Sequence, residues 1–267
     1  MAADDLFTGS IPQIYDRCLV PLIFESYARD LAARLEKIEP EDVLEIAAGT
    51  GVVTRAIASL LPNARIVATD LNRQMLDHAA IRQLDGNITW RQADALALPF
   101  ENASFDAVLC QFGAMFFPDK IQAYREAYRV LKPGGYFLFN VWDDISANEF
   151  ADVVTQALAE LFPDDPPRFM ARIPHGYHDR DKIREELMAA GFTRISIEPV
   201  EARSMAASPR EPAIAYCQGT PLRNEIELRG VAGLEAATNA AAEALARRFG
   251  VGPVEGRIRA YVITAAP

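Results

Sequence analysis

Short runs of apolar residues alternate with stretches of helical periodicity between residues 43 and 142, and no other feature constrains the fold of this chain as strongly. The apolar runs are nearly continuous, as in strands that are covered on both faces. Strands that alternate with helices predict a parallel, doubly wound sheet with right-handed crossovers. A proline and two glycines at 133–135 are expected to end the last helix. The expected strands are 43–47, 64–70, 87–90, 105–112 and 136–142, and the helices between them are 52–61, 72–84 and 119–131.

The residues outside this core predict further helices and two more strands. The second of these strands alternates apolar and polar residues, as an edge or antiparallel strand does. We therefore predict an α/β fold with a doubly wound, seven-stranded, mostly parallel sheet whose last strand is antiparallel, an N-terminal helical segment, and helical insertions near the C-terminal half. The expected elements are one or two helices within 11–37, helices at 147–162, 179–190 and 234–248, strands at 192–200 and 257–265, and an irregular, partly helical insertion up to about 233.

Composition excludes several classes of protein. The formal net charge of -10 disfavours nucleic acid as a partner, because an acidic surface repels phosphates. Three widely spaced cysteines without a metal-binding motif indicate reduced thiols and no metal site. The N-terminus is acidic where a signal peptide is basic, and the longest apolar stretch, 107–117, is too short for a membrane span. We expect a cytoplasmic protein with no membrane span and a small-molecule partner.

The chain is expected to form one domain over residues 1–267. Residues 40–142 would make its ligand-binding core. The flanking segments 1–39, 143–180 and 201–255 would form a lid and shape the site for a second ligand.

The segment LEIAAGTG, residues 44–51, ends the first strand in a turn too small for most side chains. Such a turn, between a strand and a helix N-terminus, is where α/β sheets bind nucleotide-like ligands. Asp70 ends the second strand, 19 residues after Gly51, a spacing suited to ribose hydroxyl groups. Asp94 follows the third strand and could accept the amino group of an adenine. Three acids at the ends of successive strands, Glu45 included, predict a site for an adenosine-containing ligand.

Glu45 distinguishes between the cofactors that contain adenosine. A nicotinamide dinucleotide would place its pyrophosphate at the turn, where an acid repels it. The dinucleotide pattern G-x-G-x-x-G also fails, because Thr54 stands at its last position. S-adenosylmethionine has an ammonium, a sulfonium and no phosphate. The tight turn would let its amino-acid tail lie against the backbone, with Glu45 near its ammonium.

Five segments together resemble the Rossmann-like, class I S-adenosylmethionine-dependent methyltransferases, in particular the small-molecule branch that includes the ubiquinone-biosynthesis type. Ala47 stands where this family usually has its first glycine. The strand ends lack the motifs of base-modifying N-methyltransferases and the acids of metal-dependent O-methyltransferases. The matching segments are VLEIAAGTG (43–51), ATDLNRQML (68–76), ADALALPF (93–100), FDAVLCQFGAMFFPD (105–119) and REAYRVLKPGGYFLFNVW (125–142).

The resemblance implies a role for individual residues around the cofactor. Tyr15, in a helical segment that often covers the cofactor in this family, would form part of a lid, although packing of one helix on another explains it equally well. The other implied residues are Glu45, Ala47, Gly49 and Gly51 for the methionine part, Asp70 for the ribose, Leu71 and Met75 near the adenosine, Asp94 and Ala95 for the adenine, and Gln111 beneath the sulfonium.

The expected function is transfer of a methyl group from S-adenosylmethionine to a small-molecule acceptor by in-line displacement. A general base is optional, and His175, His178 and Tyr177 are candidates for it, although surface-loop positions explain them equally well. A nicotinamide-dependent oxidoreductase on the same topology and a non-catalytic S-adenosylmethionine-binding protein are the alternatives. The sequence does not identify the acceptor or the atom that is methylated.

Apolar residues of the insertion between the last two strands, such as Tyr216, Leu222 and Ile226, are predicted to line the acceptor site. A surface decoration or a dimer contact is an equal alternative for this segment.

Overall fold

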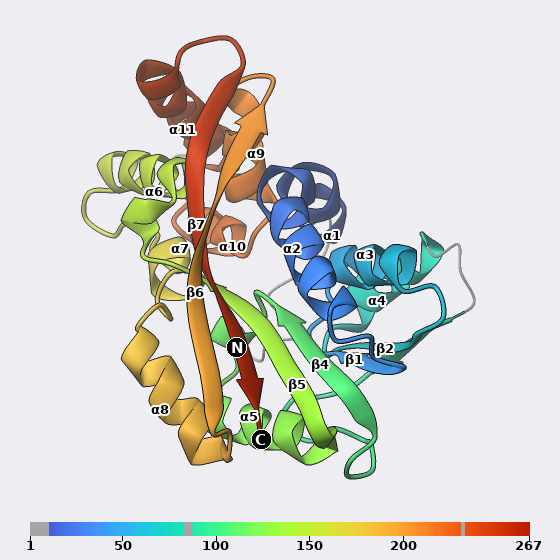
Figure 1. Cartoon of the computed structure of the whole chain (residues 1–267). Coiled ribbons are helices and arrows are strands. Elements are labelled where there is room, and N and C mark those ends of the chain that lie inside the picture. Colours follow the sequence, from blue (N-terminus) through green and yellow to red (C-terminus); the bar gives the residue numbers. More distant parts are fainter. Residues whose placement is uncertain (1–10, 83–86, 231–232) are drawn as a thin grey trace. The chain divides into compact units, whose positions relative to one another are not determined.

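The computed structural model describes residues 11–82, 87–230 and 233–267, and these residues divide into two compact units (Figure 1). We call them the sheet unit and the helical unit, and every statement about a unit concerns its described residues. The sheet unit is Glu25–Val141, Tyr177–Val200 and Ala260–Pro267, and the helical unit is Met1–Phe24, Trp142–Gly176 and Glu201–Arg259.

The sheet has seven strands in the order β3-β2-β1-β4-β5-β7-β6, which confirms the predicted fold class. The first four strand pairs, from β3 to β5, are parallel. β7 runs opposite to β6 (Figure 1), and Thr193 N donates to Ala266 O where the two strands meet. The strands are β1 (Asp42–Glu45), β2 (Arg65–Asp70), β3 (Ile88–Gln92), β4 (Phe105–Gln111), β5 (Leu131–Trp142), β6 (Arg194–Ala206) and β7 (Val254–Ala266).

Two groups of helices bury the two faces of the sheet unit. α2 (Glu25–Glu36) and α3 (Val52–Leu60) share one apolar cluster with the face that carries Val43, Ile66 and Leu109. On the opposite face, Phe137 and Phe139 stack with ring centroids 4.8 Å apart, and Tyr124 of α5 (Lys120–Val130) packs on both. α8 (Arg180–Ala190) packs against α5, and α4 (Arg73–Ile81) lies beside β2 and β3. Burial on both faces explains the continuous apolar runs of the central strands.

Side-chain caps decide where two of these helices begin. Asn72 accepts hydrogen bonds from Gln74 N and Met75 N, and Asp119 accepts one from Gln122 N. Each cap residue lies just outside its helix, because the cap has extended backbone geometry. The predicted helices 72–84 and 119–131 therefore start one residue later. The predicted end of the first, at residue 84, lies outside the described residues.

The helical unit packs helices around small side chains. Ala237, Ala241 and Leu245 lie one turn apart on α11 and are completely buried. Alanine lets helix axes approach closely, and α11 packs against α6 and α9. The elements are α1 (Ile11–Ile14), the π-helix η2 (Tyr15–Phe24), the 3₁₀ turn η4 (Ile145–Ala147), α6 (Glu149–Leu161), α7 (Phe169–Arg172), α9 (Arg210–Gln218), α10 (Leu222–Leu228) and α11 (Gly233–Phe249).

Two local predictions were wrong, and one predicted helical segment has an unexpected helix type. The segment after residue 200 continues β6 to Ala206, because pairing with β7 extends the strand. β5 begins at Leu131, opposite Phe105, and the proline and glycines form an irregularity within this strand pair. The segment from Tyr15 to Phe24 is a π-helix, and Pro21 inside it cannot donate a helical hydrogen bond.

No helix within the described ranges has the length and apolar character that crossing a membrane requires.

Candidate functional site

The glycine turn lies between β1 and α3 at the carboxyl edge of the sheet, where the parallel strands end. Gly49 and Gly51 have φ angles of 57° and 78°, which glycine adopts without steric cost. Ala48 N donates to Thr69 O at 2.8 Å and fixes the turn against β2. A Cβ atom built on Gly49 would meet no described atom within 4 Å. This open space is what a ligand lying against the turn requires.

Asp70, at the end of β2, holds the turn from the side. Its Oδ2 accepts a hydrogen bond from Gly49 N at 2.8 Å, and its Oδ1 accepts one from Asn72 N at 2.8 Å. A carboxylate has about four lone-pair sites, so each oxygen can accept more than one hydrogen bond. The side chain is half-buried. Asp70 therefore has a structural role in the turn, and its role toward a ribose stays a prediction.

Glu45 is a buried carboxyl group, only 1% exposed. The Thr54 hydroxyl donates to its Oε2 at 2.5 Å. Burial raises the pKa of Glu45 to about 8, against the opposing effects of Thr54 and Arg55. Nearby, the Thr50 hydroxyl is buried without a hydrogen-bond partner among the described residues. A cation at this place would favour the Glu45 carboxylate, and a ligand group could satisfy the Thr50 hydroxyl.

Gly51 has a second reason to be glycine. A Cβ atom there would lie 2.5 Å from the Trp90 ring, an impossible contact. The tight turn predicts space for a ligand at this glycine, whereas in the structure the indole of Trp90 in β3 takes part of that space.

Gly113 leaves room for the side chain of Ala47. The φ of Ala47, 55°, is left-handed, and a Cβ atom on Gly113 would lie only 2.5 Å from the Ala47 Cβ. The loop after β4 thus makes room for the alanine that stands where the family has glycine.

Gln111 lies on the same face of the sheet as the two acids. Glu45 is in register with Ala68 of β2 and Leu109 of β4. Side chains two positions apart on a strand point to the same face. Asp70 comes two residues after Ala68, and Gln111 comes two residues after Leu109, so both lie on the face of Glu45. The strand ends therefore bring together three predicted site residues that are distant in the sequence.

The residues predicted around the adenosine follow β2 and β3. Met75 is buried, and Leu71 and Ala95 are half-buried. Asp94 is exposed, and its Oδ1 accepts a hydrogen bond from Leu96 N at 2.9 Å. Their roles around an adenosine stay a prediction.

Tyr15 belongs to the helical unit. Its ring centroid lies 5.1 Å from that of Phe24. Phe24 belongs to the same helix, so this contact does not test the expected packing of one helix on another, and the role of Tyr15 in a lid stays a prediction.

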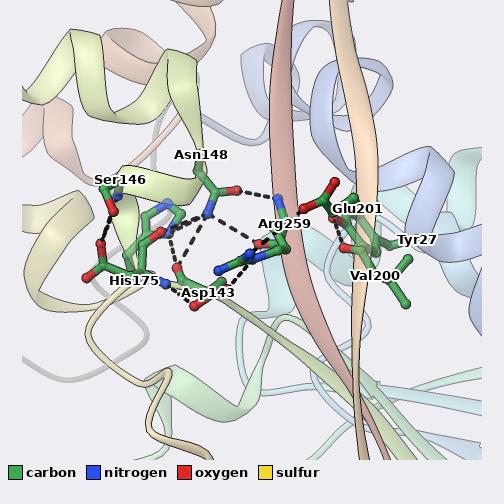
Figure 2. A network of polar contacts seen from close by, with 9 residues as sticks. Tyr27, Asp143, Ser146, Asn148, His175, Val200, Glu201 and Arg259 are labelled. Atoms are coloured by element: carbon green, nitrogen blue, oxygen red, sulfur yellow. Dashed lines mark hydrogen bonds and ion pairs between the residues drawn. The ribbon is translucent and has the colours of Figure 1, made fainter.

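His175 also belongs to the helical unit, and it is part of a buried polar network (Figure 2). Its Nδ1 lies 2.8 Å from the Asp143 carbonyl oxygen, which can only accept, so Nδ1 carries the hydrogen and Nε2 the lone pair of the neutral ring. The Asp143 carboxylate is bound by Arg259. Asn148 donates to the Asp144 and Arg259 carbonyl oxygens. The network therefore holds the neutral ring in one tautomer, and the role of His175 as a general base stays a prediction.

The surroundings of the Tyr177 hydroxyl do not suit a general base. Its hydroxyl donates to Glu186, and the Tyr124 hydroxyl lies 3.0 Å away. Burial and the neighbouring Tyr124 raise its pKa further above the ordinary value. The phenol therefore stays protonated and links α5 to α8, which favours a packing role. His178 lies next to it in the sequence, is half-buried and stays a candidate.

The described residues contain no group of three or more His, Cys, Asp or Glu side chains that could hold a metal ion. Cys18, Cys110 and Cys217 are free thiols, and burial raises the pKa of Cys110 to about 12.

Four neighbours of the site residues were not predicted from the sequence: Thr54 as the partner of Glu45, Trp90 beside Gly51, Gly113 beside Ala47, and Asn140 next to Gln111. Only the last left a usable signal, because it is a polar residue near the end of an otherwise apolar strand.

The comparisons with known proteins agree with this geometry. A model of the methyltransferase domain matches residues 44–139. The chain is 32% identical over 207 residues to the ubiquinone/menaquinone biosynthesis C-methyltransferase UbiE of Pseudomonas aeruginosa, covering 72% of this chain and 76% of that protein. The chain belongs to the class I S-adenosylmethionine-dependent methyltransferases. A shorter match, 36% identical, covers 50% of this chain and 57% of the demethylmenaquinone methyltransferase of Deinococcus radiodurans.

Solved structures confirm the methyltransferase fold. The YcgJ protein of Bacillus subtilis is 20% identical with a TM-score of 0.57, over 90% of this chain and 97% of that one. The [4+2]-cyclase SpnF is also 20% identical, with a TM-score of 0.58, over 91% of this chain and 80% of that one. At such identity these likenesses show the fold alone.

Membership of this family confirms the main functional expectation. The enzyme transfers a methyl group from S-adenosylmethionine to a small-molecule acceptor. Neither alternative, the nicotinamide-dependent oxidoreductase or the non-catalytic binding protein, is supported by the relatives.

Proposed function

We propose that the carboxyl edge of the sheet unit binds S-adenosylmethionine. The observation that carries this proposal is the arrangement of Glu45, Gly49 and Asp70, in which a buried carboxyl group, an open backbone and a second acid lie at adjoining strand ends. The unpaired Thr50 hydroxyl within the turn supports it. A ligand with a cationic amino-acid end and a ribose fits these groups.

The cofactor would lie along the strand ends in the order of the sheet. Glu45, Ala47, Gly49 and Gly51 would hold its methionine part, Asp70 its ribose, Leu71 and Met75 the adenosine, Asp94 and Ala95 the adenine, and Gln111 the sulfonium end, with Tyr15 as part of a lid.

When bound, S-adenosylmethionine supplies a methyl group that is already activated by the sulfonium. The protein then needs mainly to align the acceptor and exclude water. His175 is the favoured candidate among the possible general bases, because its hydrogen-bonded Nδ1 places the lone pair on Nε2. The chain would act as one domain, in which 40–142 hold the cofactor and 1–39, 143–180 and 201–255 decide which acceptor is used.

The residues predicted to line the acceptor site have not gained support. Tyr216, Leu222 and Ile226 are at most 2% exposed and belong to the core of the helical unit. Their role in acceptor binding stays a prediction.

We infer that the acceptor is an aromatic ring with hydroxyl groups, of the hydroquinone type. The two relatives named above support this class, since their names describe methyl transfer in ubiquinone and menaquinone biosynthesis. The net charge of -10 favours a small molecule over nucleic acid, and free thiols favour a reducing compartment such as the cytoplasm.

Calorimetric titration with S-adenosylhomocysteine tests the cofactor site. Conversion of S-adenosylmethionine in the presence of reduced demethylmenaquinone, followed by mass spectrometry of the product, tests the acceptor class. Amine and carboxylate acceptors serve as controls. Methylation of an amine but of no hydroquinone would contradict the proposed acceptor class, whereas the proposed cofactor site would stand.

A further inference from the structure

Asn140 lies beside Gln111 at the carboxyl edge of the sheet. The two residues are in register on the neighbouring strands β5 and β4, which run side by side (Figure 1). Paired residues of parallel strands point to the same face, so Asn140 shares the face of Glu45, Asp70 and Gln111. A polar side chain at this position therefore extends the row of site residues by one strand.

The orientation of the Asn140 carboxamide is fixed by a backbone group. Phe112 N lies 3.1 Å from its Oδ1. A backbone N–H can only donate, so the atom facing Phe112 must be the oxygen, and the amide nitrogen points elsewhere. Phe112 has a left-handed φ of 51°. Its ring packs edge-on against the ring of Tyr27, with the two ring centroids 5.3 Å apart. Phe112 N also donates to the Asn140 carbonyl oxygen at 3.2 Å, but a flipped amide would place its nitrogen, a second donor, against the same N–H, which is unfavourable.

The amide nitrogen of Asn140 has no hydrogen-bond partner within the described part of the chain. The residue is 0% exposed, and its Nδ2 is sealed from water. An unpaired buried donor is unfavourable, and native structures contain few of them. An apolar residue of similar size would avoid this penalty. The Phe112 contact explains the oxygen of this side chain, and the nitrogen still needs an acceptor.

The strand order indicates what that acceptor is. The proposed cofactor contacts run from Asp70 on β2 through Glu45 on β1 to Gln111 on β4, and β5 is the next strand. A group beyond the sulfonium end is placed to meet the methyl acceptor rather than the cofactor. An N–H donor requires a lone pair, so it suits an oxygen and repels an ammonium group.

We propose that Asn140 Nδ2 donates a hydrogen bond to an oxygen of the methyl acceptor, and that Asn140 thereby selects acceptors with a hydroxyl, phenolate or carbonyl oxygen near the reacting atom. This inference rests on the proposed cofactor site and does not depend on the acceptor being a hydroquinone.

The Asn140→Asp variant tests the proposal, because it keeps an oxygen for Phe112 and replaces only the donor. With 1,4-naphthohydroquinone as the probe, the KM for the acceptor should rise about tenfold or more, the effect of one hydrogen bond of about 1.4 kcal/mol, while the affinity for S-adenosylhomocysteine stays within about twofold. The deficit should shrink as the pH is lowered, because a protonated carboxyl group donates again. A merely structural residue would not show this pH profile.

Asn87→Asp is the matched control. Asn87 lies at the opposite, amino edge of the sheet, where its Nδ2 donates to the Pro62 and Ala64 carbonyl oxygens. The same change of amide to acid there should lower stability and leave the acceptor KM unchanged. In the wild-type protein, the side-chain amide resonances of Asn140, assigned by triple-resonance spectroscopy, should shift when the probe is added to the complex with S-adenosylhomocysteine. This measurement serves if the variant does not fold.

Three results would overturn the proposal: an unchanged acceptor KM in Asn140→Asp at every pH, a parallel loss of S-adenosylhomocysteine affinity, or amide resonances that do not respond to a bound acceptor. If the wild-type enzyme methylates no hydroquinone, the acceptor class fails separately. The same KM comparison is then made with whichever phenol, carboxylate or amine is methylated, and an amine without oxygen would count against Asn140 as the donor.

Discussion

At the amino edge of the sheet the carboxylates Asp42 and Asp106 share one ammonium, whereas at the carboxyl edge the acids are held by backbone N–H groups and a hydroxyl. The Lys132 Nζ lies 2.8 Å from Asp42 and 2.9 Å from Asp106, and Arg65 adds a second cation to Asp42. Partial burial raises the pKa of both acids, but the hydrogen bonds from Lys132 outweigh it, and the net pKa of each is lowered.

The carboxyl edge shows the opposite balance. Thr54 donates to Glu45, and Gly49 N donates to Asp70. For Glu45, burial dominates and the pKa rises to about 8. The pKa values of acids on the same sheet thus shift in opposite directions, because at the amino edge the protein itself supplies the compensating positive charge. We infer that the other edge receives it from the ligand, and the following predictions test this difference.

The largest expected effect is that of Asp70→Ala on cofactor affinity. Two ribose hydrogen bonds to a charged group, each about 1.5–3 kcal/mol, predict a loss of about a hundredfold or more. Titration calorimetry with S-adenosylhomocysteine measures it. Asp42→Ala, at the amino edge, should lower the melting temperature and leave the affinity unchanged. Equal effects of the two variants on affinity would erase the distinction between the edges.

The affinity for S-adenosylhomocysteine should depend on pH through Glu45. The pKa of Glu45 is about 8 in the folded protein and its ordinary value is 4.5, so between these values folding takes up a proton and stability falls as the pH rises, by up to about 1.4 kcal/mol per pH unit. An ammonium beside Glu45 favours the carboxylate. Binding should therefore release a proton below about pH 8, and affinity should rise with pH by at most about tenfold per unit until that pH.

Calorimetry in buffers of different ionisation enthalpy counts the proton released. The amino group of the ligand also titrates, and Glu45→Gln isolates its contribution. If Glu45→Gln retains the full pH dependence, Glu45 is not the group that loses the proton.

Gly113→Ala should destabilise the protein by about 2 kcal/mol, because the new methyl group would overlap Ala47 and the Cys110 sulfur. Adding Ala47→Gly removes the closer contact and should restore about 1 kcal/mol. Urea unfolding of the two single variants and the double variant gives the coupling. Gly252→Ala, where no described atom lies within 4 Å, is the control. Strictly additive effects would show that Ala47 and Gly113 are independent.

The smallest expected effect is that of Lys132→Met at the amino edge. Because the Lys132 side chain is 34% exposed, its two ion pairs should contribute at most about 1 kcal/mol. The lowered pKa values of Asp42 and Asp106 mean that this stability is present above their ordinary value of 3.8 and is lost as the pH falls through their folded values. Unfolding in urea at neutral and acid pH measures it. Cofactor affinity should not change, and a weaker affinity would connect the two edges.

The sequence predicted the sheet unit well because its signals are local. Continuous apolar runs mark strands buried on both faces, and helical periodicity marks the segments between them. Prediction was poorer where pairing between residues distant in the sequence decides the secondary structure. The residues 201–206 carry charged and small side chains, and they form a strand because β7 pairs with them. Tyr177 was a candidate base, but its partners, Tyr124 and Glu186, are set by the packing of α5 against α8.

The sequence by itself determined the glycine turn, the acid at the end of β2 and the family to which they belong, because a turn and a strand end depend on residues that are neighbours in the chain. The tertiary structure alone decided that Trp90 packs against Gly51, that Gly113 accommodates Ala47, and that the nitrogen of Asn140 is buried without a partner. These features depend on residues far apart in the sequence, and the Phe112–Asn140 bond that orients the amide itself joins residues 28 positions apart. Their chemistry depends on distance and burial, and both arise only when strands and helices pack.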